Sequence, residues 1–361
     1  MVIAKKNPNT SRIRFAGALT KSRFTATVPW IFLIRVTSLK FREMLRFLTP
    51  TVAFLALFSI LSSTPVLAWD DAGHKITTVI AWKSMTPTAR ARAVEILMAA
   101  PEDSMLSAFY SGDSRPEATR KLELFMIAST WPDMVRDRNF PTRYGKYHKS
   151  SWHYADTFWT EENGAFKSLG NVAGEGGLAV EKIIEFEKLL ADPTAQKSDK
   201  AIALAWILHL VGDIHQPLHA SARVTDLEPK GDQGGNLFLL TPRETPREKQ
   251  MSLHWFIDSI VGRNIERGDA CDSDYLFPIA DAITKTYPMS MFRDQSSDGA
   301  DKWQQESVSL TQREVFTPAL IRFQTPTDEY RKQIFKMSEK RLAQAGYRMA
   351  SLLNRALDGG K

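Results

Sequence analysis

The chain has 361 residues, one cysteine and a formal net charge of +6. The first 68 residues carry ten of the 47 Lys and Arg residues and one of the 41 Asp and Glu residues, which leaves 37 basic and 40 acidic residues in the remainder. The remainder is therefore slightly acidic, so any attraction for polyanions has to be local. The single Cys271 excludes an internal disulfide. No apolar run after residue 68 approaches the roughly 20 residues that span a bilayer.

Residues 44–68 have the pattern of a secretory signal peptide. A basic start is followed by a mostly apolar run, and Val66 and Ala68 place small side chains where a signal peptidase reads them. Cleavage after Ala68 would make Trp69 the first residue of an exported protein, periplasmic or secreted, without a transmembrane anchor. Residues 1–43 are interpreted as an upstream extension or a misassigned start.

Residues 69–361 predict a single, compact all-α domain with long loops. Thr86-Pro87 is a helix-start signal. Apolar residues then recur at helical spacing, and the expected helices cover residues 86–100, 177–190, 199–214, 252–261 and 327–356. The third of these is apolar on nearly every side, which is typical of a buried central helix. Gly, Pro and charged residues mark loops at 101–116, 225–250 and 288–301, of which 225–250 is the place expected for one short hairpin.

Two short segments pair a histidine with an aspartate four residues later, His209 with Asp213 and His254 with Asp258. Side chains at this spacing lie on one face of a helix, so each pair could hold one metal ion. A surface ion pair is the alternative for either pair alone. The first pair, however, lies in the least polar helix, where an unpaired charge is costly.

Pro217 ends the first of these helices, so that His219 can turn towards a second ion. Nitrogen and carboxylate ligands without thiolate favour zinc in a hydrolytic rather than a structural role. His215 lies six residues after His209 and faces away from it, which suits a core or outer-shell histidine. His148 is expected to be a solvated loop residue.

The predicted cleavage would create a third set of ligands. The free α-amine and the backbone carbonyl of Trp69 can chelate a metal ion. His74, five residues further on, can add an imidazole. The signal-peptide prediction and the metal-site prediction therefore depend on each other.

The motifs together resemble the secreted, single-strand-specific zinc nucleases of the S1/P1 type, which are distant relatives of zinc phospholipase C. The resemblance rests on Trp69 with Gly73-His74, Trp131-Pro132-Asp133, Trp152-His153-Tyr154-Ala155-Asp156, His209 to His219, Gly234-Gly235-Asn236, and Leu253-His254-Trp255 with Asp258. Each motif alone is weak, but their combination and order are specific. The family's all-α fold agrees with the helical pattern.

The resemblance implies three zinc ions per chain, with nine ligand residues. It assigns Asp133, His153, His209 and Asp213 to the first ion, His219, His254 and Asp258 to the second, and Trp69 and His74 with a bridging Asp213 to the third. Asp137 is a rival for the role of Asp133, but the Trp-Pro-Asp context favours Asp133. Three zinc ions would bring six positive charges, and the three aspartates would offset only three of them. The net positive charge of the cluster would give an acidic protein a local attraction for phosphodiesters.

The implied reaction is hydrolysis of single-stranded DNA and RNA to 5′-phosphate products, and of 3′-mononucleotides, by a hydroxide held between the first and third ions. Asp213, as their bridge, and Arg136, beside the phosphate, are the implied catalytic residues; a surface arginine is the alternative for Arg136. Tyr154 and Asp156 match positions that stack on a base and hydrogen-bond its edge, although Tyr154 could be a core aromatic. Asn236 is a further substrate-binding candidate, or simply turn chemistry. No stable protein partner is implied.

The chain departs from the family pattern at Asp70-Asp71, where the family usually has glycine after the tryptophan, and the extra acid could alter the third site. Two other functions stay open. A phospholipase C-like phosphodiesterase would need an apolar, lipid-facing rim, whereas Tyr154 with Asp156 favours the nuclease. An exported zinc-binding protein without catalysis is disfavoured by the complete ligand set.

Overall fold

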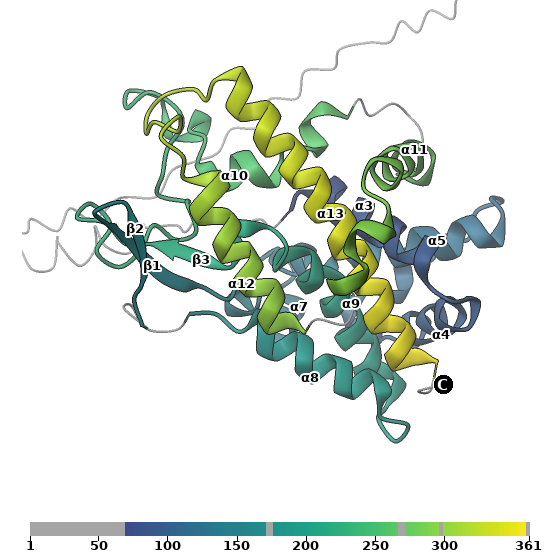
Figure 1. The fold of residues 1–361 in the computed structure, drawn as a ribbon. Helices are drawn as coiled ribbons and strands as arrows, with labels where there is room; N and C mark the ends of the chain where they lie inside the picture. The colour runs from purple at the N-terminus through teal and green to yellow at the C-terminus, as the bar shows by residue number, and fades with distance from the viewer. Residues whose placement is uncertain (1–68, 171–175, 266–271, 296–298, 359–361) are drawn as a thin grey trace, which may run out of the picture. The chain divides into compact units, whose positions relative to one another are not determined.

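The computed structural model describes residues 69–170, 176–265, 272–295 and 299–358 (Figure 1). They form a mostly helical single domain with one small sheet, as the sequence predicts. Its helices are α3 (Asp71–Ser84), α4 (Pro87–Met98), α5 (Glu117–Ala128), α6 (Trp131–Met134), α7 (Pro141–Tyr147), α8 (Ala179–Ala191), α9 (Lys197–Asp213), α10 (Leu253–Asp258), α11 (Asp272–Thr286), α12 (Ala300–Leu310) and α13 (Asp328–Leu357). The signal peptide and extension predicted within residues 1–68, and Cys271, lie outside the described residues.

α9 runs through the middle of the apolar interior. Its residues 203–213 are all buried, on every face of the helix. This burial explains why the segment lacks the polar stripe of a surface helix. α8 and α4 pack on α9, and α13, the long yellow helix of Figure 1, packs along α3. None of the helices within the described ranges is long and apolar enough to cross a membrane.

The five predicted helices are confirmed, with ends shifted by a few residues. Thr86 caps α4 by accepting the N–H of Ala89 at 3.0 Å, and Thr327 caps α13 by accepting that of Tyr330 at 3.3 Å. The predicted helix at 252–261 is shorter, because α10 ends at Asp258. α3, α5, α6, α7, α11 and α12 are not among the helices expected from the sequence.

The hairpin prediction was placed at the wrong loop. β1 (Thr157–Glu162) and β2 (Ala165–Ser168) form the antiparallel hairpin, joined by Asn163 and Gly164, whose φ angles are +53° and +77°. An Asn-Gly pair favours this two-residue turn, and the signal was overlooked. The segment 225–250 instead contains turns and an isolated bridge to Ser252. β3 (Ser221–Arg223) pairs in parallel with β1, so the sheet order is β2-β1-β3.

A close helix contact depends on Gly346 of α13. A Cβ at this position would lie 2.6 Å from Ile80 Cβ and 2.9 Å from the carbonyl oxygen of Thr77, both on α3. Neither neighbour is the free end of a flexible side chain. Glycine therefore allows α13 to approach the helix that carries His74.

Gly346→Ala is expected to lower the melting temperature by about 2–6 °C, measured by calorimetry. The gain in helix propensity, about 1 kcal/mol, is smaller than the cost of overpacking against α3. Gly145→Ala in α7 is the matched control, because an added Cβ there meets nothing within 4 Å. A higher melting temperature for Gly346→Ala would contradict the close contact.

Candidate metal centre

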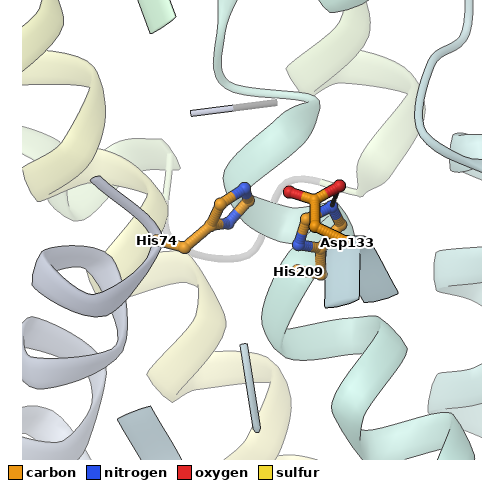
Figure 2. Close-up of side chains that lie close together, drawn as sticks. All are labelled: His74, Asp133 and His209. Carbon is orange, nitrogen blue, oxygen red and sulfur yellow. Dashed lines mark ion pairs between the residues drawn. The ribbon is translucent and has the colours of Figure 1, made fainter. Parts of the chain in front are cut away.

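Eight histidine and aspartate side chains predicted as metal ligands converge in the interior. They come from α3, α6, the turn before β1, α9, the turn after it, and α10. Figure 2 shows three of them, His74, Asp133 and His209, from three different helices. Their donor atoms form three sets, each within 4.8 Å. Two sets share His209 and together make the first group: His74, Asp133 and His209, and His153, His209 and Asp213. His219, His254 and Asp258 make the second group.

The atoms around His209 have the spacing of a zinc site. His209 Nε2 lies 2.9 Å from His153 Nδ1, 3.2 Å from Asp213 Oδ2 and 3.8 Å from Asp133 Oδ1. His153 Nδ1 lies 3.3 Å from Asp213 Oδ2 and 4.0 Å from Asp133 Oδ1. Ligands of a tetrahedral zinc at its usual bond lengths are roughly 3.3 Å apart. The residues predicted for the first ion therefore fit it.

Asp213 turns its two oxygens in different directions. Oδ2 faces His153 and His209, while Oδ1 lies 3.4 Å from His74 Nε2. A carboxylate with this orientation can bridge two ions. Burial alone would raise the pKa of Asp213, but His209 and His219 hold that pKa well below its ordinary value.

The second group lies at the end of α9 and on α10. His254 Nε2 is 3.2 Å from Asp258 Oδ2, and His219 Nε2 is 3.9 Å from Asp258 Oδ1. Burial raises the pKa of Asp258 well above its ordinary value; the hydrogen bond from Gln216 opposes this, and Asp213 adds to it. An ion bound here would replace the proton of that carboxyl.

Backbone carbonyls fix the orientation of three of these imidazoles. The Nδ1 atoms of His209, His219 and His254 lie 2.7, 2.6 and 2.7 Å from the carbonyl oxygens of Ser129, His153 and Gly234. A carbonyl only accepts, so each Nδ1 carries the proton and each Nε2 keeps a lone pair for a metal.

Several donor atoms of this centre are buried and have no hydrogen-bond partner among the described residues. They are His74 Nδ1 and Nε2, Asp133 Oδ1, His153 Nε2, both oxygens of Asp213, His219 Nε2 and Asp258 Oδ2. Unpaired buried polar atoms are costly, and so many in one place call for an ion. The donor set contains imidazole and carboxylate only, which suits zinc.

Gln216 contacts the candidate metal centre, and the sequence had not indicated this position. Its Nε2 donates to Asp258 Oδ1 at 2.6 Å, and its Oε1 accepts the N–H of Leu218 at 2.6 Å. The side chain thus fixes both the carboxylate of the second group and the turn that carries His219. The signal was its place in the His215-Gln-Pro-Leu-His219 motif, to which no role had been given.

Trp69 lies beside the first group. Its side chain is fully buried, and its Nε1 donates to the carbonyl oxygen of Gly212 at 3.0 Å. A Cβ on Gly212 would lie 2.9 Å from His74 Nδ1, so glycine lets His74 approach α9. These contacts hold Trp69, His74 and Asp213 in one small region.

Asp70 and Asp71, the departure from the family pattern, have structural roles at the start of α3. Asp70 Oδ1 accepts the N–H of Gly73 at 3.0 Å and caps the helix, and Asp71 pairs with Lys75 at 2.8 Å. The backbone N–H of Asp70 also donates to the carbonyl oxygen of Asp258 at 3.1 Å, which ties the segment after Trp69 to α10.

Arg136 lies at the centre and Asp137 does not. Arg136 Nη2 is 3.2 Å from Asp133 Oδ1, whereas Asp137 is exposed and accepts the N–H of Asn139 in a turn. His148 is half-buried and stacks on Tyr144 at 4.8 Å, so its prediction as a solvated residue was wrong.

His215 is a core residue, as one of its two predicted roles has it. Its Nδ1 donates to the carbonyl oxygen of Val211 at 2.7 Å, and its Nε2 lies 3.0 Å from Arg348 Nη1. Arg348 in turn makes two contacts of 2.7 Å with Glu306. This buried network joins α12 and α13 to the end of α9.

A cavity of about 270 Å³ adjoins the second group. His254 and Leu218 line it, together with Tyr154, Asp156, Phe158, Ala222, Lys230, Gln233 and Gly234. Burial and the nearby Asp232 raise the pKa of Asp156 well above its ordinary value. Asn236 is not among the lining residues; its Nδ2 donates to the carbonyl oxygen of Gln233 at 2.9 Å, as the turn alternative expects.

Gln216→Ala is expected to weaken zinc binding at the second group about 10–100-fold, because the support of Asp258 is lost. Competition with a chromophoric chelator measures the affinity. Gln250→Ala is the control, since that amide donates to the loop carbonyl of Thr245, away from the centre. Equal zinc affinity in wild type and Gln216→Ala would show that Asp258 needs no such support.

Comparison with known proteins agrees with this geometry. The S1/P1 Nuclease family model matches residues 69–358. Endonuclease 2 of Arabidopsis thaliana is 25% identical over 321 residues, which cover 83% of this chain and 94% of that protein. The family's nucleases hydrolyse phosphodiester bonds of nucleic acids and are in general zinc-dependent; the relation to zinc phospholipase C stays a prediction. The chain belongs to the S1/P1 nuclease family.

Proposed function

We propose that the protein is an exported endonuclease and 3′-nucleotidase with three zinc ions per chain. It hydrolyses single-stranded DNA and RNA to 5′-phosphate products and releases phosphate from 3′-mononucleotides. One observation carries the proposal: buried imidazole and carboxylate donor atoms converge beside a cavity of about 270 Å³ that is large enough for a base.

Two ions would be held by the residues of the two groups. The first would use Asp133, His153, His209 and Asp213, and the second His219, His254 and Asp258. Bound zinc lowers the pKa of water to about 7 and stabilises negative charge on phosphate oxygens. Burial, together with Arg136, lowers the pKa of His153 to about 3, so this imidazole stays neutral and ready to bind an ion.

The third ion would be held by the amine and carbonyl oxygen of Trp69, by His74 and by Asp213. The support is the position of Trp69, whose indole is bonded to Gly212, the residue before Asp213. Asp213 Oδ1 faces His74 at the same place. Cleavage after Ala68 is part of this proposal, because only a free amine can serve as a ligand.

Arg136 would bind the non-bridging oxygens of the phosphate that reacts. Its side chain is 14% exposed and that of Asp133 17%, whereas the other paired ligand side chains are at most 4% exposed. Substrate therefore reaches the centre on the side of Asp133. The guanidinium is already oriented there by its contact with Asp133 Oδ1, which limits the reorganisation needed when a phosphate arrives.

Single-strand preference would come from Tyr154 and Asp156. Stacking on Tyr154 requires a base that has left the duplex stack. Because the pKa of Asp156 is raised, its carboxyl can be protonated and can donate a hydrogen bond to a base edge as well as accept one. Neither contact depends on a particular sequence.

The purified, exported protein should degrade denatured DNA and RNA faster than duplex DNA of the same sequence, and should release phosphate from 3′-AMP. Tyr154→Ala should lower kcat/KM for denatured DNA about tenfold, while Tyr154→Phe retains it, because stacking is worth about 1–3 kcal/mol per base. Product ends are read by mass spectrometry. Turnover of phosphatidylcholine without nucleotide or phosphate release would overturn the proposal.

Asp213→Asn is expected to lower kcat/KM by more than about 100-fold, since loss of an outer-shell partner alone costs 10–100-fold and this residue would bridge two ions. Elemental analysis should show less zinc per chain. Asp137→Asn removes the same charge from the exposed turn and should change neither value. Wild-type turnover and zinc content in Asp213→Asn would rule out the bridge.

A further inference from the structure

The segment between Asp133 and His153 is anchored at both ends by the candidate metal centre. Asp133 Oδ1 and His153 Nδ1 lie 4.0 Å apart, although 19 residues separate them in the chain. The exposed side chains of this excursion are therefore held close to the metal centre, where the phosphate would react. α7 (Pro141–Tyr147, Figure 1) is its only α-helix after α6.

The excursion is strongly basic in an acidic domain. Between residues 136 and 149 it has five Lys and Arg residues and one acid, Asp137. Two of the five have carboxylate partners: Arg136 pairs with Asp133, and Lys146 with Asp103 at 2.6 Å. The other three, Arg138, Arg143 and Lys149, make no ion pair with any carboxylate in the part of the chain that the structure describes.

Aromatic side chains alternate with these cations. Phe140 is 52% exposed, with the guanidinium of Arg143 over its ring at 4.3 Å. Arg138 lies over the ring of Tyr144 at 5.5 Å, and Tyr144 stacks on His148. Arg143 Nε is buried and has no hydrogen-bond partner among the described residues. Exposed rings combined with unpaired cations are the features of surfaces that bind single-stranded nucleic acid.

Cation–π contacts also occur in ordinary surface clusters of arginines and aromatic residues. This cluster differs from them because it lies beside the candidate metal centre. Burial lowers the pKa of His148, and Arg136, Arg138 and Lys149 lower it further. The cluster begins at Arg136, which pairs with Asp133 at the exposed side of the centre. The base cavity adjoins the other group, at His254.

From this arrangement, and resting on the proposed function, we infer that residues 138–149 form a second subsite for single-stranded nucleic acid. Arg138, Arg143 and Lys149 bind phosphates of the strand beyond the scissile bond, and Phe140 stacks on one of its bases. The subsite holds polymers and is out of reach of a mononucleotide in the base cavity. It supplies a local basic surface in a domain whose net charge is slightly negative.

Direct binding tests the subsite without turnover. Anisotropy of a labelled, hydrolysis-resistant single strand of about 12 nucleotides gives the Kd of the zinc-loaded protein at several salt concentrations. Arg138→Ser with Arg143→Ser should raise the Kd about tenfold and reduce the slope of log K against log salt by about 1.4, since each phosphate contact contributes about 0.7. Phe140→Ala should raise the Kd at least about fivefold, and Phe140→Tyr should restore it.

A charge-matched control removes two exposed lysines from other helices, Lys188→Ser with Lys285→Ser, and should leave the Kd and the slope unchanged. All substituted side chains are at least partly exposed, and unchanged melting temperatures verify folding. Loss of binding equal to that of the control would overturn the subsite.

Turnover separates this inference from the proposed function. Arg138→Ser with Arg143→Ser should lower kcat/KM for denatured DNA, mainly through KM, and leave that for a dinucleoside monophosphate unchanged. Equal losses on both substrates would mean that the segment only supports the metal centre. If the wild-type protein cleaves neither substrate, the proposed function fails, while the binding data still decide the subsite.

Discussion

The cost of burying Asp213 without compensation constrains the rest of the molecule. Its carboxylate is fully buried at the end of an apolar helix, and both oxygens lack hydrogen-bond donors among the described residues. Histidines from two other segments face it, with His74 on one oxygen and His153 on the other. Such a site is stable only if positive charge is supplied. Ions bound by these residues would therefore contribute to the stability of the fold.

The helices around the centre act as a rigid frame for these ligands. α9 is held by α8 and α4, and its last turn continues into the Gln216-Pro217 turn, which directs His219 to the second group. Next to that turn, His215 is hydrogen-bonded to Arg348, and Arg348 is hydrogen-bonded to Glu306. A charged network thus fixes the back of the turn, while Gln216 fixes its front. Ligands held in this way lose little entropy when ions bind.

In the proposed function, two surfaces beside the centre bind different parts of the nucleic acid. The cavity at Tyr154 and Asp156 would accept one base, and the basic excursion at residues 138–149 would bind the neighbouring strand. A domain with net negative charge needs both, because its overall field does not attract nucleic acid. Candidate metal ligands lie close in the chain to the residues of each surface. The chain connections therefore limit the distance between the metal centre and the two surfaces.

The sequence by itself determined the central helices and the family, and it indicated the candidate ligand residues, because helical spacing and ordered motifs are local patterns. The Asn163-Gly164 pair is also a local signal, and it indicates the turn of the β1–β2 hairpin. Only the tertiary structure decided that the oxygens of Asp213 face different histidines, that Gln216 supports Asp258, and that the excursion returns to its starting point. These facts depend on contacts between residues far apart in the chain. Whether such contacts form depends on the packing of the whole domain, which local sequence patterns do not determine.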